Sequence, residues 1–367
     1  MKQILSLPLF LCFVLATAFG QVPEDAVSEN KDPEALIKQG TQFHDKGEYD
    51  KAVQKYLAAI AIDPKNASAY YEASYSYHLK RDYENGLKMA DKAIELGSGE
   101  TRKMAVVVKG SILDDMGRRK DSAELYEKAI KDYPDFYLLW FNYGVTLAAL
   151  KRYDEAENAY IKGLSYRLNH PGSNLQLGKL KDFENQKAPA SLCYYFFLLL
   201  EPNTARSKDA ATSLRRLLYG NPADTVKKAI TININASALE DGNPLSSAEL
   251  FFGLLGTTGD EIDKTVGKKS SAQERFVNDT DRYFGMLSEL KTKQPEATGK
   301  KKKKKGAGQP NFYFDTYVPF FTDLKAADHV EAFCYYIMKT IGDPQVDKWT
   351  KNNQEKLNRF YAWLKKR

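Results

Sequence analysis

The sequence predicts an all-α protein: a solenoid of helical hairpins followed by a helical C-terminal region. Three observations predict this class. A pattern of large and small residues recurs about every 34 residues across the N-terminal half. Proline ends several of the copies, where it stops a helix. After the copies, apolar residues continue at helical spacing, and the strand-like run at 229–234 has no second strand with which to form a sheet.

The N-terminal residues form a leader that differs from the rest of the chain. Lys2 is followed by an apolar run at 4–14 and then by small residues, which is typical of a secretory signal peptide cleaved before Gln21. A membrane anchor is the alternative, but the run is short for ~30 Å of hydrocarbon. We therefore expect an exported protein, periplasmic or secreted, with a signal peptide at 1–20, a linker at 21–32 and no transmembrane segment after signal removal.

The repeated unit couples two helices through residues of contrasting size. In the second helix, a tyrosine is followed three positions later by a small residue and four positions after that by an aromatic one, as in Tyr49, Ala52 and Tyr56. In the first helix, a large residue is followed four positions later by a small one, most clearly Trp140 and Gly144. Small residues let two helices approach closely, and the large residues fill the space between them.

The copies are degenerate but stay in register. The expected units are 33–66, 67–100, 103–136, 137–170 and 171–204. In period and pattern they resemble the tetratricopeptide repeat (TPR) family, and among its members the exported bacterial proteins of unassigned role. This resemblance implies a scaffold without catalytic activity that binds other proteins through five TPR-like repeats over 33–204. A helix at 205–220 is expected to cap the stack, because an end repeat must cover its exposed face.

Two departures from the repeat pattern stand out. Gly86 replaces the usual alanine inside a helix, at a cost of about 1 kcal/mol. Lys181 occupies a position of the last copy where an apolar residue is expected. We interpret the last copy as the weakest of the five.

The resemblance implies that the first helix of each hairpin lines an inner groove. The candidate groove residues are Ile37, Thr41, His44, Tyr71, Tyr75, His78, Met104, Val107, Phe141 and Val145. This surface is apolar and aromatic, and it lacks the Lys and Asn set with which some family members hold the C-terminal carboxylate of a peptide. Such a groove fits a segment of a protein or peptide partner. The chain's own C-terminal region is an equally weighted alternative occupant.

The sequence predicts neither a metal site nor a catalytic site. His44 and His78 occupy equivalent positions in neighbouring repeats, but stacked helices lie ~8–10 Å apart, which is wide for a shared zinc ion. No Cys or carboxylate set completes such a site. The chain contains no HExxH, GxSxG or phosphate-binding glycine motif, so we expect no cofactor. An enzyme whose site forms only in the folded C-terminal half is a weaker alternative.

The basic character of the chain is local. The formal net charge is +6, and six lysines lie in one block, Lys300, Lys301, Lys302, Lys303, Lys304 and Lys305. Outside the leader and this block the chain carries 47 basic and 48 acidic residues, so its surface is not built to bind nucleic acid. We expect a disordered Lys-rich loop at 293–310. It either contacts an acidic partner or an anionic envelope polymer, or serves as a solubilising spacer.

The region 221–367 is expected to be helical without further repeats. Helices are predicted at 246–255, 271–290 and 329–341, and a last one from Asp343 to the C-terminus. The aromatic cluster at 312–321 is expected to dock these helices onto the solenoid. Cys193 and Cys334 lie in aromatic-rich helical runs, and we predict that both are buried thiols rather than a disulfide.

Two functions therefore remain. The first is an exported scaffold or adaptor that binds a protein or peptide segment through its apolar and aromatic groove. The alternative is a glycan-binding or envelope-polymer-binding protein that uses the aromatic cluster at 312–321 and the Lys-rich loop at 293–310. The sequence indicates neither the identity of the partner nor the biological process or oligomeric state.

Overall fold

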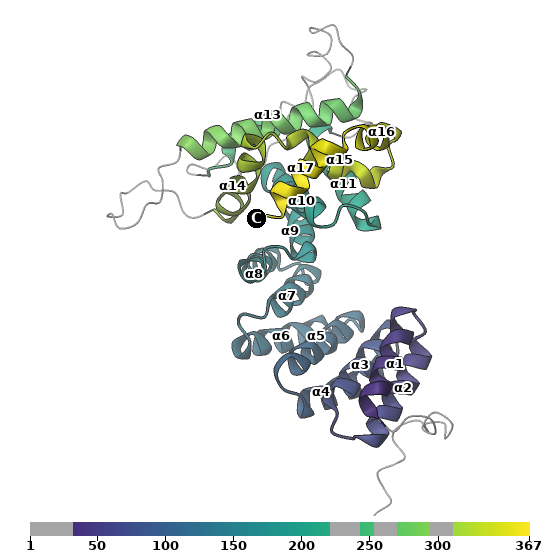
Figure 1. Cartoon of the computed structure of the whole chain (residues 1–367). Coiled ribbons are helices and arrows are strands. Elements are labelled where there is room, and N and C mark those ends of the chain that lie inside the picture. Colours follow the sequence, from purple (N-terminus) through teal and green to yellow (C-terminus); the bar gives the residue numbers. More distant parts are fainter. Residues whose placement is uncertain (1–31, 221–242, 253–269, 294–310) are drawn as a thin grey trace, which may run out of the picture. The chain divides into compact units, whose positions relative to one another are not determined.

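Each expected repeat folds into two antiparallel helices joined by a short turn, which confirms the predicted all-α class (Figure 1). The computed structural model describes residues 32–220, 243–252, 270–293 and 311–367. Within these ranges all regular elements are helical. The chain divides into two compact units, the first ending at Pro134 and the second beginning at Asp135. The expected leader, the run at 229–234 and the lysine block lie outside the described residues.

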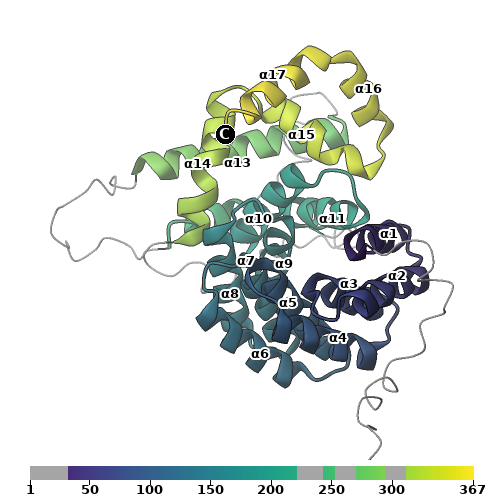
Figure 2. The ribbon, with the colours of Figure 1, turned by 60° about the horizontal axis from the view of Figure 1, so that its bottom comes forward.

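The first unit holds three hairpins, stacked in sequence order (Figure 2). Its helices are α1 (Pro33–Asp45), α2 (Tyr49–Ile62), α3 (Ala67–Leu79), α4 (Tyr83–Leu96), α5 (Gly99–Asp115) and α6 (Arg119–Asp132). Several of these helices begin with a side-chain N-cap. Asp32, Asn66 and Asp82 each accept a hydrogen bond from a backbone N–H of the first helical turn. Helix α5 begins at Gly99, before the expected start at 103, so the slip between the second and third copies becomes an extra helical turn.

The turn inside each hairpin has the same backbone conformation. Its left-handed residue is Gly47, Arg81, Gly117, Lys151 or Asn185 in the five repeats. Asp328 takes this conformation in the C-terminal region, with N–H bonds at 3.0 Å from Asp328 to Lys325 and at 3.1 Å from His329 to Leu324. The C-terminal region therefore contains a corner of the repeat type that the sequence pattern does not reveal.

The second unit holds two hairpins and the C-terminal helices. Its elements are α7 (Tyr137–Ala149), α8 (Tyr153–Tyr166), α9 (Pro171–Phe183), α10 (Lys187–Leu200), α11 (Ala205–Tyr219), a helical segment at 246–252, α13 (Ala272–Lys293), α14 (Phe312–Ala326), α15 (Val330–Met338), the 3₁₀ turn η4 (Lys339–Ile341), α16 (Pro344–Asn352) and α17 (Gln354–Leu364). The single last helix predicted from Asp343 is wrong: it is broken at Asn353, whose side chain bonds the Trp349 carbonyl at 3.0 Å. None of the described helices is long and apolar enough to cross a bilayer.

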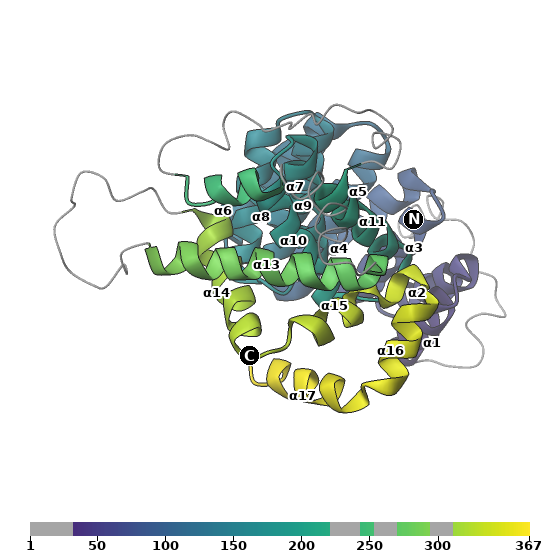
Figure 3. The ribbon, with the colours of Figure 1, turned by 90° about the horizontal axis from the view of Figure 1, so that it is seen from above.

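Helix α10 is the centre of the second unit. Its residues from Ala188 to Leu199 are all buried, which fits a helix that is apolar on every side. The Tyr195 ring lies 5.3 Å from Phe284 of α13, 5.8 Å from Phe321 of α14 and 5.9 Å from Phe333 of α15, measured between ring centroids. Figure 3 shows α13 lying across α10 and beside α14 and α15. The C-terminal helices therefore wrap the last hairpin and share its core.

Cys193 and Cys334 are buried free thiols, which confirms that prediction. Burial raises the pKa of Cys193 to about 12 and also raises the pKa of Cys334, so little thiolate forms at neutral pH. We expect iodoacetamide to label both thiols at least a hundredfold faster in denaturant than in buffer. Peptide mapping by mass spectrometry measures the two rates separately. Equal labelling of either thiol with and without denaturant would contradict its position in the core.

Candidate functional site

The first helices of the three hairpins in the first unit, α1, α3 and α5, together present what we call the A-helix face. It carries eight of the ten candidate groove residues: Ile37, Thr41, His44, Tyr71, Tyr75, His78, Met104 and Val107. All eight are half-buried, so they belong neither to the closed core nor to the fully solvated surface. Their role in binding stays a prediction.

The structure brings His44 together with residues of the next repeat. The Nδ1 atom of His44 lies 2.7 Å from the hydroxyl oxygen of Ser76, and its ring lies 4.9 Å from that of Tyr75. Burial lowers the pKa of His44, so the ring is neutral at pH 7. The hydroxyl of Tyr56 reaches Thr41 at 3.4 Å from the neighbouring helix α2. The His44 contacts hold α1 against α3, and the Tyr56 contact holds α2 against α1, under the A-helix face.

His78 has a different environment from His44. Its Nε2 atom lies 2.8 Å from an oxygen of Asp115, at the end of α5. Each histidine therefore contacts its own partner in the next repeat. Over the described ranges, no group of three or more His, Cys, Asp or Glu side chains has the arrangement of a metal site.

Glu72 is the residue of the A-helix face that sequence reasoning missed. It follows Tyr71 on α3, is half-buried, and makes no ion pair among the residues described. Burial, and then the charge of Asp45, raise its pKa. Burial also raises the pKa of Tyr71, so that hydroxyl stays protonated. The sequence signal is that position 72 adjoins the predicted groove residue Tyr71.

Replacing Glu72 with glutamine should stabilise the first unit at pH 7. The folded-state pKa of Glu72 lies above its unfolded value, so the folded chain binds more protons, and stability falls as pH rises through the window between the two values. The gain should be below about 1 kcal/mol, because Glu72 is only partly shielded from solvent. Thermal unfolding of wild type and variant at pH 4 and pH 7 measures it. The difference should vanish at the lower pH; a gain independent of pH would contradict the assignment.

Phe141 and Val145, the other two candidate groove residues, lie on α7 in the second unit. Both are half-buried and pack against the core of that unit. The Phe141 ring meets the ring of His170 edge-on at 4.8 Å. His170 caps α9, accepting the N–H of Ser173 at 3.2 Å, and burial and then Arg167 lower its pKa to about 4. This cluster therefore fixes the start of α9.

The aromatic cluster at 312–321 forms most of α14 and docks onto the last two hairpins. The Tyr313 hydroxyl donates to Glu157 of α8 at 2.5 Å, and the Tyr317 hydroxyl donates to Asn174 of α9 at 2.7 Å. Lys181, the residue that broke the repeat pattern, donates to Glu157 and lies 5.6 Å from the centre of the Tyr313 ring. The predicted docking role of the cluster is confirmed.

The same burial bears on the glycan-binding alternative. Sugars stack on exposed aromatic faces, but Tyr313, Phe314, Tyr317 and Phe321 are buried. These rings pack against the core because α14 turns them toward α10 and α13, as with Phe321 and Phe284 at 4.7 Å. These four rings therefore offer no stacking surface for a sugar, whereas Phe312 and Phe320 of the cluster are half-buried, and glycan binding stays a prediction. The other half of that alternative, the lysine block, lies outside the described residues.

Comparison with known proteins places the repeats in a family. A family profile described as TPR repeat matches residues 40–80, and one described as tetratricopeptide repeat matches residues 107–164. Tetratricopeptide repeat protein 36 of Xenopus tropicalis is 24% identical over 155 residues, which are 41% of this chain and 74% of the relative. Its human counterpart is 27% identical over 111 residues, 30% of this chain and 57% of that protein, so the chain spans less than two thirds of its length.

Among solved structures, pilF of Pseudomonas aeruginosa is similar in fold. It is 21% identical, with a TM-score of 0.44, and the match covers 63% of this chain and 97% of that one. The two family profiles match residues of the hairpins described above.

Proposed function

Since this chain is a tetratricopeptide-repeat protein, we propose that it is an adaptor without catalytic activity which holds a segment of a partner protein on the A-helix face of its first unit. The observation that carries the proposal is the set of half-buried aromatic residues on that face, above all Tyr71 and Tyr75. Tyrosine gives a large contact area at low cost in side-chain entropy, and one end of it can bond a polar group.

The proposed occupant is an extended or helical segment rather than a peptide's C-terminal carboxylate. Glu72 and Asp45 make the face acidic between α1 and α3, so a free carboxylate would be repelled. An apolar segment gains from the rings, while its polar groups can reach the half-buried ring of His44.

A peptide library displayed on phage and selected against the full chain tests the proposal. Affinities of the selected peptides are then measured for wild type, for the double variant Tyr71→Ser and Tyr75→Ser, and for a matched control. The control is Phe183→Ser with Tyr361→Ser, because these aromatic residues are exposed in the second unit. We expect at least a tenfold loss with the first variant only. Equal affinities for all three proteins, or the lack of any selected peptide, would refute the proposed site.

We also propose that the adaptor acts outside the cytoplasm. The support is the composition of the leader at 1–20, with its basic start, apolar middle and small residues before Gln21. The intact mass of the protein isolated from its native cells should match a chain that starts at Gln21. A mass that includes the leader would contradict the proposal.

A further inference from the structure

The docking of α14 shows what occupies one side of the repeat stack in the second unit. The site lies where α8, α9 and α10 meet, away from the positions of the predicted groove. Tyr313 and Tyr317 bond Glu157 and Asn174, as described above, and the Tyr317 ring lies 5.4 Å from the ring of Phe196 on α10. Two aromatic side chains four residues apart on a helix thus fill a furrow between successive hairpins.

The repeat register locates the same furrow in the first unit. Gly178 faces Tyr194 in the fifth repeat as Gly110 faces Tyr126 in the third, an offset of 68 positions for both residues. Lys181, Cys193 and Phe196 therefore correspond to Leu113, Leu125 and Lys128. Glu157 of the fourth repeat corresponds to Leu87 of the second, 70 positions earlier, as Gly144 corresponds to Ser74.

All four corresponding residues line an open cavity of about 430 Å³ between α4, α5 and α6, which we call the α4–α6 furrow. Leu87, Leu113 and Leu125 form its apolar floor. Charged pairs form its rim: Lys109 lies 2.6 Å from Asp91, and Arg118 lies 2.6 Å from Asp121. The furrow that α14 fills in the second unit is therefore open in the first.

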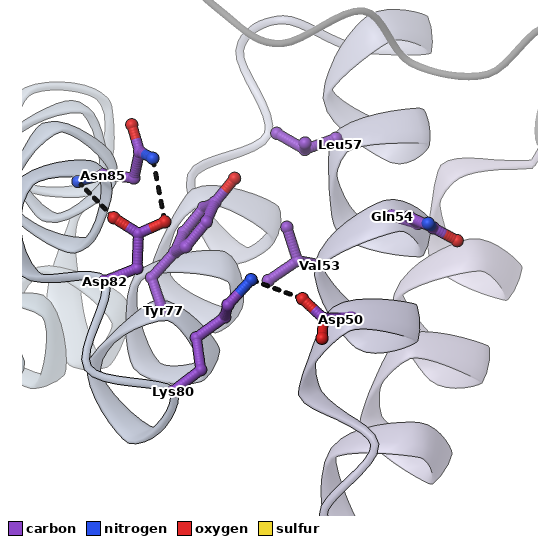
Figure 4. A pocket seen from close by; sticks show the side chains of 8 residues that line it. All are labelled: Asp50, Val53, Gln54, Leu57, Tyr77, Lys80, Asp82 and Asn85. Atoms are coloured by element: carbon purple, nitrogen blue, oxygen red, sulfur yellow. Dashed lines mark hydrogen bonds and ion pairs between the residues drawn. The ribbon is translucent and has the colours of Figure 1, made fainter.

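The preceding furrow, between α2, α3 and α4, is smaller and more polar. Its volume is about 250 Å³, and Figure 4 shows the ion pair of Lys80 and Asp50 spanning it beside the ring of Tyr77. This pair and ring already fill part of the space that an inserted side chain would need. The α4–α6 furrow is thus the better candidate of the two.

We propose that the α4–α6 furrow binds an amphipathic helix of a partner protein, which inserts a phenylalanine or another fully apolar side chain. The equivalent site in the second unit takes a tyrosine because Glu157 accepts its hydroxyl. In the α4–α6 furrow a leucine, Leu87, replaces that acceptor. A tyrosine hydroxyl at this point would lose that acceptor, so the furrow should favour phenylalanine over tyrosine. This surface is separate from the A-helix face and goes beyond the function proposed above.

A labelled peptide tests the proposal directly. The probe is a fluorescein-labelled peptide of residues 311–326, the α14 sequence with its cap, and a second version carries Tyr313→Phe. Fluorescence anisotropy follows both with the full chain, whose own α14 occupies the second-unit furrow. We expect saturable binding, with the phenylalanine version at least about threefold tighter because Leu87 cannot accept the hydroxyl of the tyrosine version.

Four variants decide where the peptide binds. Leu87→Glu and Leu125→Glu place a charge on half-buried floor positions, and each should weaken binding at least tenfold. Leu79→Glu, at an exposed leucine outside the furrow, should leave binding unchanged. The double variant Tyr71→Ser and Tyr75→Ser should also leave it unchanged, so that failure of the A-helix face and failure of the furrow are distinguished. Circular dichroism checks that each variant is folded.

Three results would overturn the proposal. They are no saturable binding of either peptide, binding that is insensitive to Leu87→Glu and Leu125→Glu, and tighter binding of the tyrosine version. Analytical ultracentrifugation tests one other occupant of the furrow, which is helix α14 of a second copy of this chain. If the full chain self-associates and Leu125→Glu abolishes the association, the furrow binds α14 of a second copy. That result would contradict binding of a partner protein.

Discussion

Replacing Lys181 with alanine should destabilise the second unit by about 3 kcal/mol, because removing one partner of a buried ion pair leaves the other charges without compensation. The Lys181 side chain is 5% exposed and bonds both Glu157 and Glu184. Glu157 in turn accepts the hydroxyl of Tyr313. Without the lysine, two shielded carboxylates face each other at the site where α14 docks.

Tryptophan fluorescence during urea unfolding measures this loss, since all three tryptophans, Trp140, Trp349 and Trp363, lie in the second unit. Lys208→Ala is the matched control, because Lys208 is exposed on α11, and its effect should stay within about 0.5 kcal/mol. The double variant Lys181→Met with Glu157→Leu should recover at least half of the loss, since it removes two of the three charges and leaves only Glu184. A loss below about 1 kcal/mol for Lys181→Ala would show that the pair does not hold α14 in place.

The structural role of Lys181 is one that the sequence alone does not predict. As a departure from the apolar pattern it indicates a weak last repeat, whereas the structure makes it the anchor of the C-terminal helices. Its partner Glu157 is 24 positions away, and Tyr313 lies 156 positions from Glu157. A local pattern carries no information about such a pairing, because each residue alone is ordinary for a surface helix.

The hairpins themselves are predictable because their determinants are close in sequence. Gly40 and Tyr56 are 16 positions apart, and four of the five hairpins close through such a pair; the second has Ser74 and Ala90 at these positions. The C-terminal helices depend on contacts between distant segments. Helix α14 is also difficult to predict from sequence, because Pro319 lies inside it and a proline normally indicates the end of a helix.

Only part of the candidate site is predictable from the sequence. The positions of the A-helix face follow from the repeat register, and its residues are half-buried as a groove lining would be. The raised pKa of Glu72 was missed because it comes from burial in the folded stack and from the charge of Asp45 in the preceding repeat. The occupied furrow beneath α14 was missed because it arises only from the folded C-terminal region.

Replacing Gly110 with alanine should destabilise the first unit by about 2–3 kcal/mol, the cost of overpacking a closed core. A Cβ atom at Gly110 would lie within 3.0 Å of three atoms of Tyr126. The ring cannot retreat at low cost, because Tyr126 is 1% exposed and its hydroxyl donates to the Val107 carbonyl at 3.0 Å. Any shift that relieves the clash therefore costs a buried hydrogen bond as well as packing.

Gly86→Ala is the control in the same unit, and it should have the opposite sign. There the nearest atom to an added Cβ is the terminal Cδ1 of Ile112, at the flexible end of its side chain, so a small rotation makes room. Alanine then gains up to about 1 kcal/mol of helix propensity over glycine. Thermal unfolding by circular dichroism, with hydrogen exchange of peptides from α5 and α6, assigns both effects to the first unit. If both alanines destabilise it equally, helix packing in the first unit does not depend on the Gly110–Tyr126 pair.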